Sequence, residues 1–221
     1  MCGRFTLRAS GEAIAAAFDL NEVPDVEPRY NIAPSQSVLA VTTSDRQTRY
    51  LRWGLVPHWA KDIKIGYRLI NARAETAAEK PSFRQAFRRR RCLVLADGFY
   101  EWQRPTTDRK QPFYFYQPHQ PPFGFAGLWE TWQDPDNQPL QSCTLLTGPA
   151  NDDVASVHHR MPIILAPEAY DLWLDAETPV PALQKFLSEY QAQPLLAHPV
   201  STAVNSPRQD SPELTAPLAS L

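Results

Sequence analysis

The sequence has little cysteine and no long hydrophobic run. Its three cysteines, Cys2, Cys92 and Cys143, show no CxxC spacing. That pattern predicts neither a disulfide framework nor a structural zinc site, and it is compatible with a reducing compartment. No stretch approaches the roughly 20 apolar residues of a membrane helix, and the N-terminus has no positive region followed by an apolar core. We therefore expect a cytoplasmic protein without a membrane segment.

A strong excess of charge is also missing, because the formal net charge is −2. The chain as a whole does not have the basic character of many nucleic-acid-binding domains, so any such binding must come from a local patch. One candidate is the arginine run 88–91, which follows the short helical pattern SFRQAF. Cations are favoured at a helix C-terminus, and a solvated arginine face is the more ordinary interpretation of this run.

What the chain does have fits one globular domain with an irregular fold. It has 221 residues, 43% of them hydrophobic, and 22 prolines. Helical patterns cover residues 12–20, after the capping residue Ser10, as well as 167–175 and 181–190. Many short strand-like segments lie between them, including a hairpin formed by 37–43 and 48–55. Because βαβ alternation is absent, we expect an α+β fold with a mainly antiparallel, barrel-like sheet core and flanking helices. The domain is expected to span residues 1–205, followed by a flexible C-terminal tail at 206–221.

Several polar residues lie inside apolar segments. Asn71, Arg73 and Glu75 follow Leu69 and Ile70, and Glu101 lies between two aromatic residues. A carboxyl group in an aromatic setting can have a raised pKa and serve as a general acid or base. The alternative for Glu101 is a solvent-facing residue in an alternating strand.

His158 and His159 are adjacent in the segment SVHHRMP. They could bind a metal, move protons or be ordinary loop residues. Adjacent side chains point apart on a strand, which disfavours a shared metal, so we expect no metal site and favour one proton-shuttling histidine.

Cys2 directly follows the initiator methionine. It could be an ordinary buried thiol. If Met1 is removed, however, Cys2 carries a free α-amine beside its thiol, and no internal residue can supply that pair.

Eight segments together resemble one family. MCGRF, RYNIAP, WGLVPHW, INARAET, RCLVLADGFYEW, FAGLWE, HHRMP and HPVSTAVN occur in the order seen in the SRAP (SOS response-associated peptidase) family. The resemblance runs from residue 1 to about 205. It implies an abasic-site processing protein that senses abasic sites in single-stranded DNA, crosslinks to them through an N-terminal cysteine as a thiazolidine, and so shields the lesion during replication and repair. No cofactor is implied, and we expect a monomer that associates with the nucleoid when bound to DNA.

The chemistry of Cys2 supports this implication independently. An α-amine with a pKa of roughly 7.7 to 8.0 is substantially neutral near physiological pH and can attack the open-chain aldehyde of an abasic sugar. The thiol of the same residue can then add to the imine carbon and close a five-membered ring.

The resemblance also implies roles for further residues. Asn71 would hydrogen-bond the N-terminal amine or the sugar, Glu101 would promote opening of the sugar ring, and His158 would move protons to and from the sugar oxygen. The other implied residues are DNA contacts: Arg4 and Arg73 for phosphates, a hydroxyl at Thr147 near the site, and Pro34 and Trp59 against bases. For Trp59, a place in the hydrophobic core is the alternative.

Two other functions stay open at this stage. Cys2 and His158 could form the nucleophile and base of a thiol peptidase, with Asn71 orienting the histidine. Alternatively, the protein could bind single-stranded DNA noncovalently, with Cys2 merely structural. The activity we expect is lyase-type crosslinking at abasic DNA, together with a peptidase activity that removes the chain's own Met1.

Overall fold

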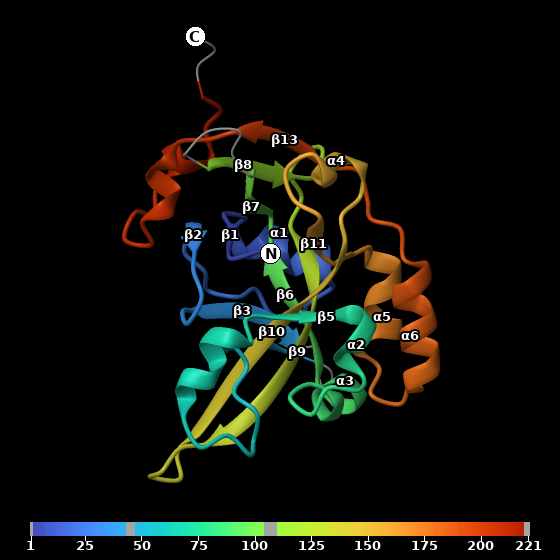
Figure 1. Cartoon of the computed structure of the whole chain (residues 1–221). Coiled ribbons are helices and arrows are strands. Elements are labelled where there is room, and N and C mark those ends of the chain that lie inside the picture. The colour runs from blue at the N-terminus through green and yellow to red at the C-terminus, as the bar shows by residue number, and fades with distance from the viewer. Residues whose placement is uncertain (1, 43–46, 104–109, 219–221) are drawn as a thin grey trace.

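The computed structural model describes residues 2–42, 47–103 and 110–218. Two sheets dominate this part of the chain, a barrel below and a smaller sheet above it in Figure 1, with most helices at one side. This arrangement confirms the expected α+β class and the mainly antiparallel, barrel-like core.

The barrel is formed by five strands that close on themselves. They are β3 (Ser37–Thr42), β4 (Thr48–Trp53), β6 (Arg91–Ala96), β9 (Phe123–Gln133) and β10 (Pro139–Pro149). All neighbours are antiparallel except β4 and β10, whose parallel pairing completes the ring. Three short strands extend this sheet: β5 (Asn71–Arg73) and β11 (Arg160–Pro162) beside β10, and β12 (Ile164–Leu165) beside β9. The hairpin predicted from the sequence is confirmed as β3 and β4, although most of its turn, residues 43–46, lies outside the described residues.

The second sheet is antiparallel throughout, in the order β13-β8-β7-β1-β2. Its strands are β1 (Arg4–Leu7), β2 (Arg29–Ile32), β7 (Gly98–Gln103), β8 (Gln111–Tyr116) and β13 (Leu196–Pro199). Strands β6 and β7 are separated only by Asp97. The chain therefore passes directly from the barrel into the second sheet at this point, which brings the start of β1 close to the barrel.

Short helices cover the sides of the two sheets. The α-helices are α1 (Gly11–Phe18), α2 (Ala74–Ala77), α3 (Arg84–Arg89), α4 (Asp152–Ala155), α5 (Tyr170–Leu174) and α6 (Val180–Glu189). The 3-10 helices are η1 (Ile63–Arg68), η2 (Pro167–Ala169), η3 (Thr202–Asn205) and η4 (Pro212–Thr215). Ser10 caps α1 as predicted, because its hydroxyl accepts a hydrogen bond from the Ala13 amide.

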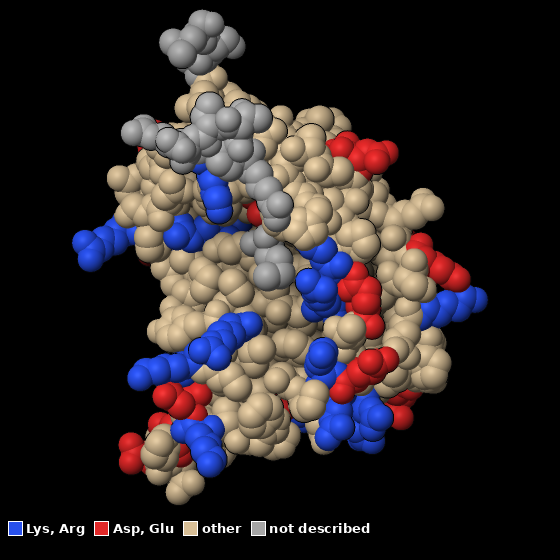
Figure 2. Space-filling view, viewed as in Figure 1, with Lys and Arg blue, Asp and Glu red and all other residues tan. Residues whose placement is uncertain are grey.

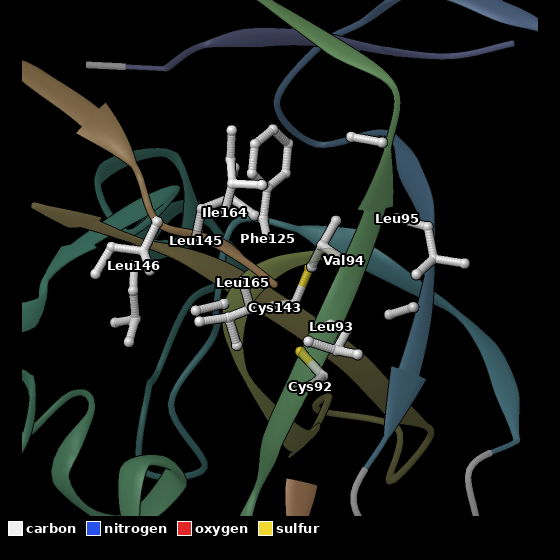
Figure 3. Close-up of a cluster of buried hydrophobic side chains, with 14 of the residues drawn as sticks. Cys92, Leu93, Val94, Leu95, Phe125, Cys143, Leu145, Leu146, Ile164 and Leu165 are labelled. Carbon is white, nitrogen blue, oxygen red and sulfur yellow. The ribbon is translucent and has the colours of Figure 1, made fainter. Parts of the chain in front are cut away.

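Aliphatic side chains of the strands fill the core. Figure 3 shows residues of β6, β9, β10 and β12 packed together, with Cys92 and Cys143 among them. Burial raises the pKa of both of these thiols above the ordinary value for cysteine. These two cysteines are therefore apolar core residues. Cys2 is equally buried, but it lies near the N-terminus, just before β1.

The arginine run is only partly a solvated face. Arg88 and Arg89 are exposed, but Arg91 is fully buried and donates hydrogen bonds to the backbone carbonyls of Phe87, Arg88, Trp173 and Asp175. Burial lowers the pKa of Arg91 to about 10. Its guanidinium therefore joins α3 to α5 and is not a surface charge.

The segment after residue 205 is packed in its described part, which differs from the flexible tail expected at 206–221. Asp210 accepts hydrogen bonds from the backbone amides of Tyr30 and Asn31 and pairs with Arg29. Leu214 of η4 is 3% exposed. The polar, proline-containing composition predicted a loose tail. The segment is nevertheless docked, because the Asp210 carboxylate accepts hydrogen bonds from β2 amides and Leu214 is buried.

Candidate functional site

Cys2 lies at the entrance to β1, between the second sheet and the barrel extension. Its side chain is fully buried, and its thiol donates a hydrogen bond to the Arg4 carbonyl at 3.6 Å. The side-chain amide of Asn71 donates to the Cys2 carbonyl at 2.7 Å. Asn71 begins β5, which is held in parallel register with β10 of the barrel. The sheet extension therefore fixes the backbone of Cys2.

The other end of the Asn71 amide is available. Its Oδ1 atom is buried and accepts no hydrogen bond from the described residues. A buried acceptor without a donor is uncommon in folded proteins, because it loses its hydration without compensation. A group with protons to donate, such as an N-terminal amine or a sugar hydroxyl, would satisfy it. Met1 itself lies outside the described residues.

Glu101 is on the neighbouring strand β7. Arg4 of β1 pairs with Tyr100 of β7, so Glu101 is level with the residues that precede β1. Its side chain is only 2% exposed, which overturns the solvent-facing alternative. Burial raises the pKa of this carboxyl group above its ordinary value. The pKa of the Cys2 thiol is also raised, first by burial and then by the charge of Glu101. The Glu101 carboxyl group is therefore close enough to influence the ionisation of the Cys2 thiol.

His158 and His159 lie in the connection between α4 and β11. Their rings stack with centroids 4.5 Å apart, so the expectation that they point apart is wrong. The residues precede β11 and are not in an extended strand, which removes the alternation on which that expectation rested. Nδ1 of His158 lies 3.0 Å from the amide nitrogen of Arg160 and 2.9 Å from its carbonyl oxygen. His159 contributes an electrostatic effect at Glu101, which lowers the pKa of that carboxyl.

Arg160 anchors this histidine turn. Its guanidinium binds both carboxylate oxygens of Glu75, and it also donates to the carbonyl of Thr147 at 2.6 Å. The pairing with Arg160 lowers the pKa of Glu75. Thr147 is fully buried, with its hydroxyl between the Ala72 carbonyl and Arg160. Thr147 is thus part of the support for Arg160.

The two arginines expected to contact phosphate have different surroundings. Arg4 is half-buried, and its guanidinium donates to Asn31 Oδ1 at 2.9 Å and to the carbonyls of Val204 and Asn205. Arg73, at the end of β5, is exposed. Arg4 therefore ties β1 to η3, whereas Arg73 is available at the surface.

Pro34 and Trp59 are both at or near the surface. Pro34 is partly exposed, and Trp59 is 49% exposed, which overturns its core alternative. Two residues of β9 hold the turn that carries Trp59. The indole nitrogen of Trp132 donates a hydrogen bond to the Ala60 carbonyl, and Glu130 contacts His58. A large apolar ring held outward on an anchored turn can pack against a ligand.

Positive charge is present on the surface of the protein although the net charge of the chain is −2. Figure 2 shows Lys and Arg side chains to both sides of the centre of the view, with Asp and Glu side chains next to several of them. Sequence reasoning assigned no role to Arg160, which supports the histidine turn, or to Asn31, which binds Arg4, and it considered His159 only as an alternative to His158. Arg160 and His159 lie inside the HHRMP motif and Asn31 inside RYNIAP, so their position within the motifs was the available signal.

Two further features of the described residues concern membrane helices and metal sites. Within residues 2–42, 47–103 and 110–218, no helix is long and apolar enough to cross a membrane. The same described residues contain no group of three or more His, Cys, Asp or Glu side chains that could hold a metal ion.

The chain is similar to a set of known proteins along almost its whole length. The family model described as SOS response associated peptidase (SRAP) matches residues 1–207. The chain is 44% identical over 220 residues to abasic site processing protein YoqW of Bacillus subtilis, covering 97% of this chain and 98% of that protein. It is 36% identical over 226 residues to abasic site processing protein HMCES of Gallus gallus, covering 86% of this chain and 66% of that protein.

Solved structures share the fold. A crystal structure of a protein from Bacteroides thetaiotaomicron matches with a TM-score of 0.88 and 24% identity, covering 99% of this chain and 100% of that one. A protein from Bordetella bronchiseptica matches with a TM-score of 0.77 and 27% identity, covering 90% of this chain and 100% of that one.

Proposed function

This chain belongs to the SOS response associated peptidase (SRAP) family, and on that premise we propose that it captures abasic sites in single-stranded DNA through Cys2. After removal of Met1, the α-amine attacks the C1′ aldehyde of the opened sugar, and loss of water gives an imine. The thiol then adds to the same carbon, and its proton passes to the nitrogen as the thiazolidine closes. The juxtaposition of Cys2, Asn71 and Glu101 is the observation that carries the proposal.

The raised pKa of Glu101 suits the first step. Because its pKa is raised, this carboxyl group keeps its proton to a higher pH than an ordinary glutamic acid does, and it can protonate the ring oxygen of the abasic sugar and so release the aldehyde. Asn71 holds the Cys2 carbonyl with its amide nitrogen, which leaves the free Oδ1 atom for the amine or the sugar. His158, whose ring is held by the Arg160 backbone, is the proposed carrier of protons to and from the sugar oxygen.

The state of the Cys2 thiol favours capture over a thiol peptidase. Cysteine nucleophiles of peptidases work as thiolates whose pKa is lowered, usually by a nearby cation. Here burial and the charge of Glu101 both raise the pKa of the thiol. A neutral thiol remains useful for ring closure, because the imine forms on the same residue and is tethered next to it.

The contacts proposed for the DNA differ in kind. Exposed Arg73 would bind a phosphate through its guanidinium, and Pro34 and Trp59 would pack against the bases beside the lesion. Arg4 and Thr147 are engaged with the protein, so we propose that they act on the DNA mainly by holding β1 and Arg160 in place.

The test is capture of an abasic oligonucleotide, followed by denaturing electrophoresis and intact-mass spectrometry. Wild type should gain the mass of the oligonucleotide at Cys2. Cys2→Ala retains an amine but cannot close the sulfur ring, so it should give no denaturant-resistant adduct. Cys92→Ala, which removes a buried thiol of the barrel, serves as the matched control and should still capture.

A second variant tests the need for a free terminus. A form that retains Met1 or a short uncleaved tag keeps the Cys2 thiol but converts its amine into an amide, which cannot form an imine. Covalent capture should disappear, while binding to intact single strands should persist. A tagged protein that still gains the oligonucleotide's mass would overturn the proposal, and equal noncovalent binding of intact and abasic strands by wild type without any adduct would favour a simple DNA binder.

A further inference from the structure

An exposed tyrosine and an arginine pair on the surface at one side of the barrel. Tyr67, in η1, is 60% exposed, and the guanidinium carbon of Arg52 lies 5.7 Å from the centre of its ring. Arg52, in β4, also donates a hydrogen bond to the Ser35 carbonyl at 2.7 Å. Ser35 directly follows Pro34 in the chain. The pair is therefore adjacent to a residue that we have proposed as a DNA contact.

The position of η1 against β4 is fixed by two glycines. Gly54 has a φ of 122°, and a Cβ atom there would lie 2.7 Å from the Gly66 carbonyl oxygen. A Cβ atom on Gly66 would in turn lie 2.6 Å from the Gly54 carbonyl oxygen. The two backbones can approach this closely only because neither residue has a side chain. The ring of Tyr67 is thus presented by a tightly packed segment.

The described residues do not neutralise the positive charge around this ring. Among the described residues, neither Arg52 nor Arg68 has a carboxylate within ion-pair distance. The Nε atom of Arg52 is buried and has no hydrogen-bond partner. Arg68 is the last residue of η1 and is exposed. The teal segment that contains η1 lies at the side of the barrel in Figure 1, and Figure 2 shows Lys and Arg side chains together with some Asp and Glu side chains over this region.

We propose that Tyr67, Arg52 and Arg68 form a second strand-binding surface, in addition to the site around Cys2. A base of the single strand stacks on the open face of Tyr67, and the guanidinium groups bind the neighbouring phosphates. This inference rests on the proposed function and adds to it a contact beyond the bases that flank the lesion. The occupant is single-stranded DNA because a flat exposed ring beside unneutralised cations fits unpaired bases and phosphates.

Binding to intact oligonucleotides of increasing length tests the surface. In a series from about 4 to about 16 nucleotides, Tyr67→Ala should match wild type on the shortest strands and lose roughly 5-fold or more in affinity once the strand reaches η1. Tyr67→Phe keeps the ring and should retain wild-type affinity. Arg68→Ala should lower the salt dependence of long-strand binding by about one unit of slope.

A matched control is Tyr50→Ala. Tyr50 is 58% exposed, but its hydroxyl donates to the Asp25 carbonyl. The pocket that it lines contains Asp25 and Glu27, and the one arginine in its lining, Arg29, is paired with Asp210. Phosphates are not attracted to such a place, so this variant should bind all lengths as wild type does. The proposal is wrong if Tyr67→Ala binds every length like wild type, or if Tyr50→Ala and Tyr67→Ala lose the same affinity.

The captured complex gives a readout independent of affinity. With the abasic site fixed at Cys2, the fluorescent base 2-aminopurine is moved one position at a time along the strand. In wild type, one position away from the lesion should show a stacking signal that Tyr67→Ala loses and Tyr67→Phe keeps. A wild-type protein that neither captures nor binds single strands would overturn the proposed function. Normal capture with no signal dependent on Tyr67 would overturn only the second surface.

Discussion

Glu101 is a buried carboxyl group whose location disfavours its charge. Burial raises its pKa, so the folded protein holds this proton more tightly than the unfolded chain does. The protonated form favours folding below the ordinary pKa of glutamic acid, and this contribution is lost as the pH rises through the raised value. We expect Glu101→Gln to be at least as stable as wild type at neutral pH. As the pH rises from the ordinary pKa of glutamic acid through the raised pKa, the free energy of unfolding of the variant should decline less than that of wild type. Urea unfolding across pH measures both.

The same variant separates stability from chemistry. Glutamine keeps the shape of Glu101 but cannot deliver a proton, so capture should slow by about 10²- to 10⁴-fold while intact strands still bind. The quench-flow rate of adduct formation at saturating DNA is the measurement. Full-rate capture combined with weakened binding would contradict the role assigned to this carboxyl.

Arg4 and Arg73 have different contacts, so replacing each with alanine should have different effects on DNA binding and on stability. Arg73→Ala removes an exposed cation and should lower the salt slope of DNA binding by about one unit, with little change in unfolding. Arg4→Ala removes hydrogen bonds to Asn31, Val204 and Asn205, so it should also lower the melting temperature. Salt titrations and thermal scans compare the two. Equal melting temperatures would show that the contacts of Arg4 contribute nothing to stability.

At the scale of elements, the C-terminal segment completes the second sheet. Asp210 accepts from two amides of β2, an edge strand that has β1 as its only partner in the sheet. Asp210→Ala leaves these amides without their acceptor and should cost about 1 to 3 kcal/mol of unfolding free energy. Denaturant unfolding measures the loss, with Glu189→Ala, an exposed residue of α6, as the control. A truncated chain that ends at residue 205 should lose at least as much.

The site depends on how these elements meet. Cys2 lies just before β1, β7 carries Glu101 and β5 carries Asn71, so one side of the site comes from the second sheet and the other from the barrel extension. The Arg160–Glu75 pair then connects the histidine turn to α2. A loss of docking between the sheets would therefore separate the amine, the acid and the amide even if each strand stayed formed.

At the scale of the whole molecule, the fold should accelerate thiazolidine formation, a reaction that a short peptide with an N-terminal cysteine can already perform. A synthetic peptide of residues 2–10 carries the same N-terminal cysteine, so it should form a thiazolidine with an abasic oligonucleotide. It lacks Glu101 and Asn71, and we expect its capture at equal concentration to be slower than that of the protein by at least about 10²-fold. Timed electrophoresis of both reactions measures the ratio. Equal rates would mean that Cys2 acts without help from the fold.

The sequence alone determined the local features of this protein. The period of α1, its Ser10 cap and the hairpin of β3 and β4 follow from neighbouring residues, and the amine-thiol pair of Cys2 follows from its place after Met1. Tertiary structure decided what depends on distant contacts. Composition indicated a loose segment after residue 205, but Asp210 finds its amides some 180 residues earlier in the chain. The arginine run was expected to be solvated, but Arg91 is buried because carbonyls of α3 and α5 converge on it. The burial that raises the pKa of Glu101 likewise exists only once two sheets enclose it, since desolvation is a property of the packed molecule and not of the strand.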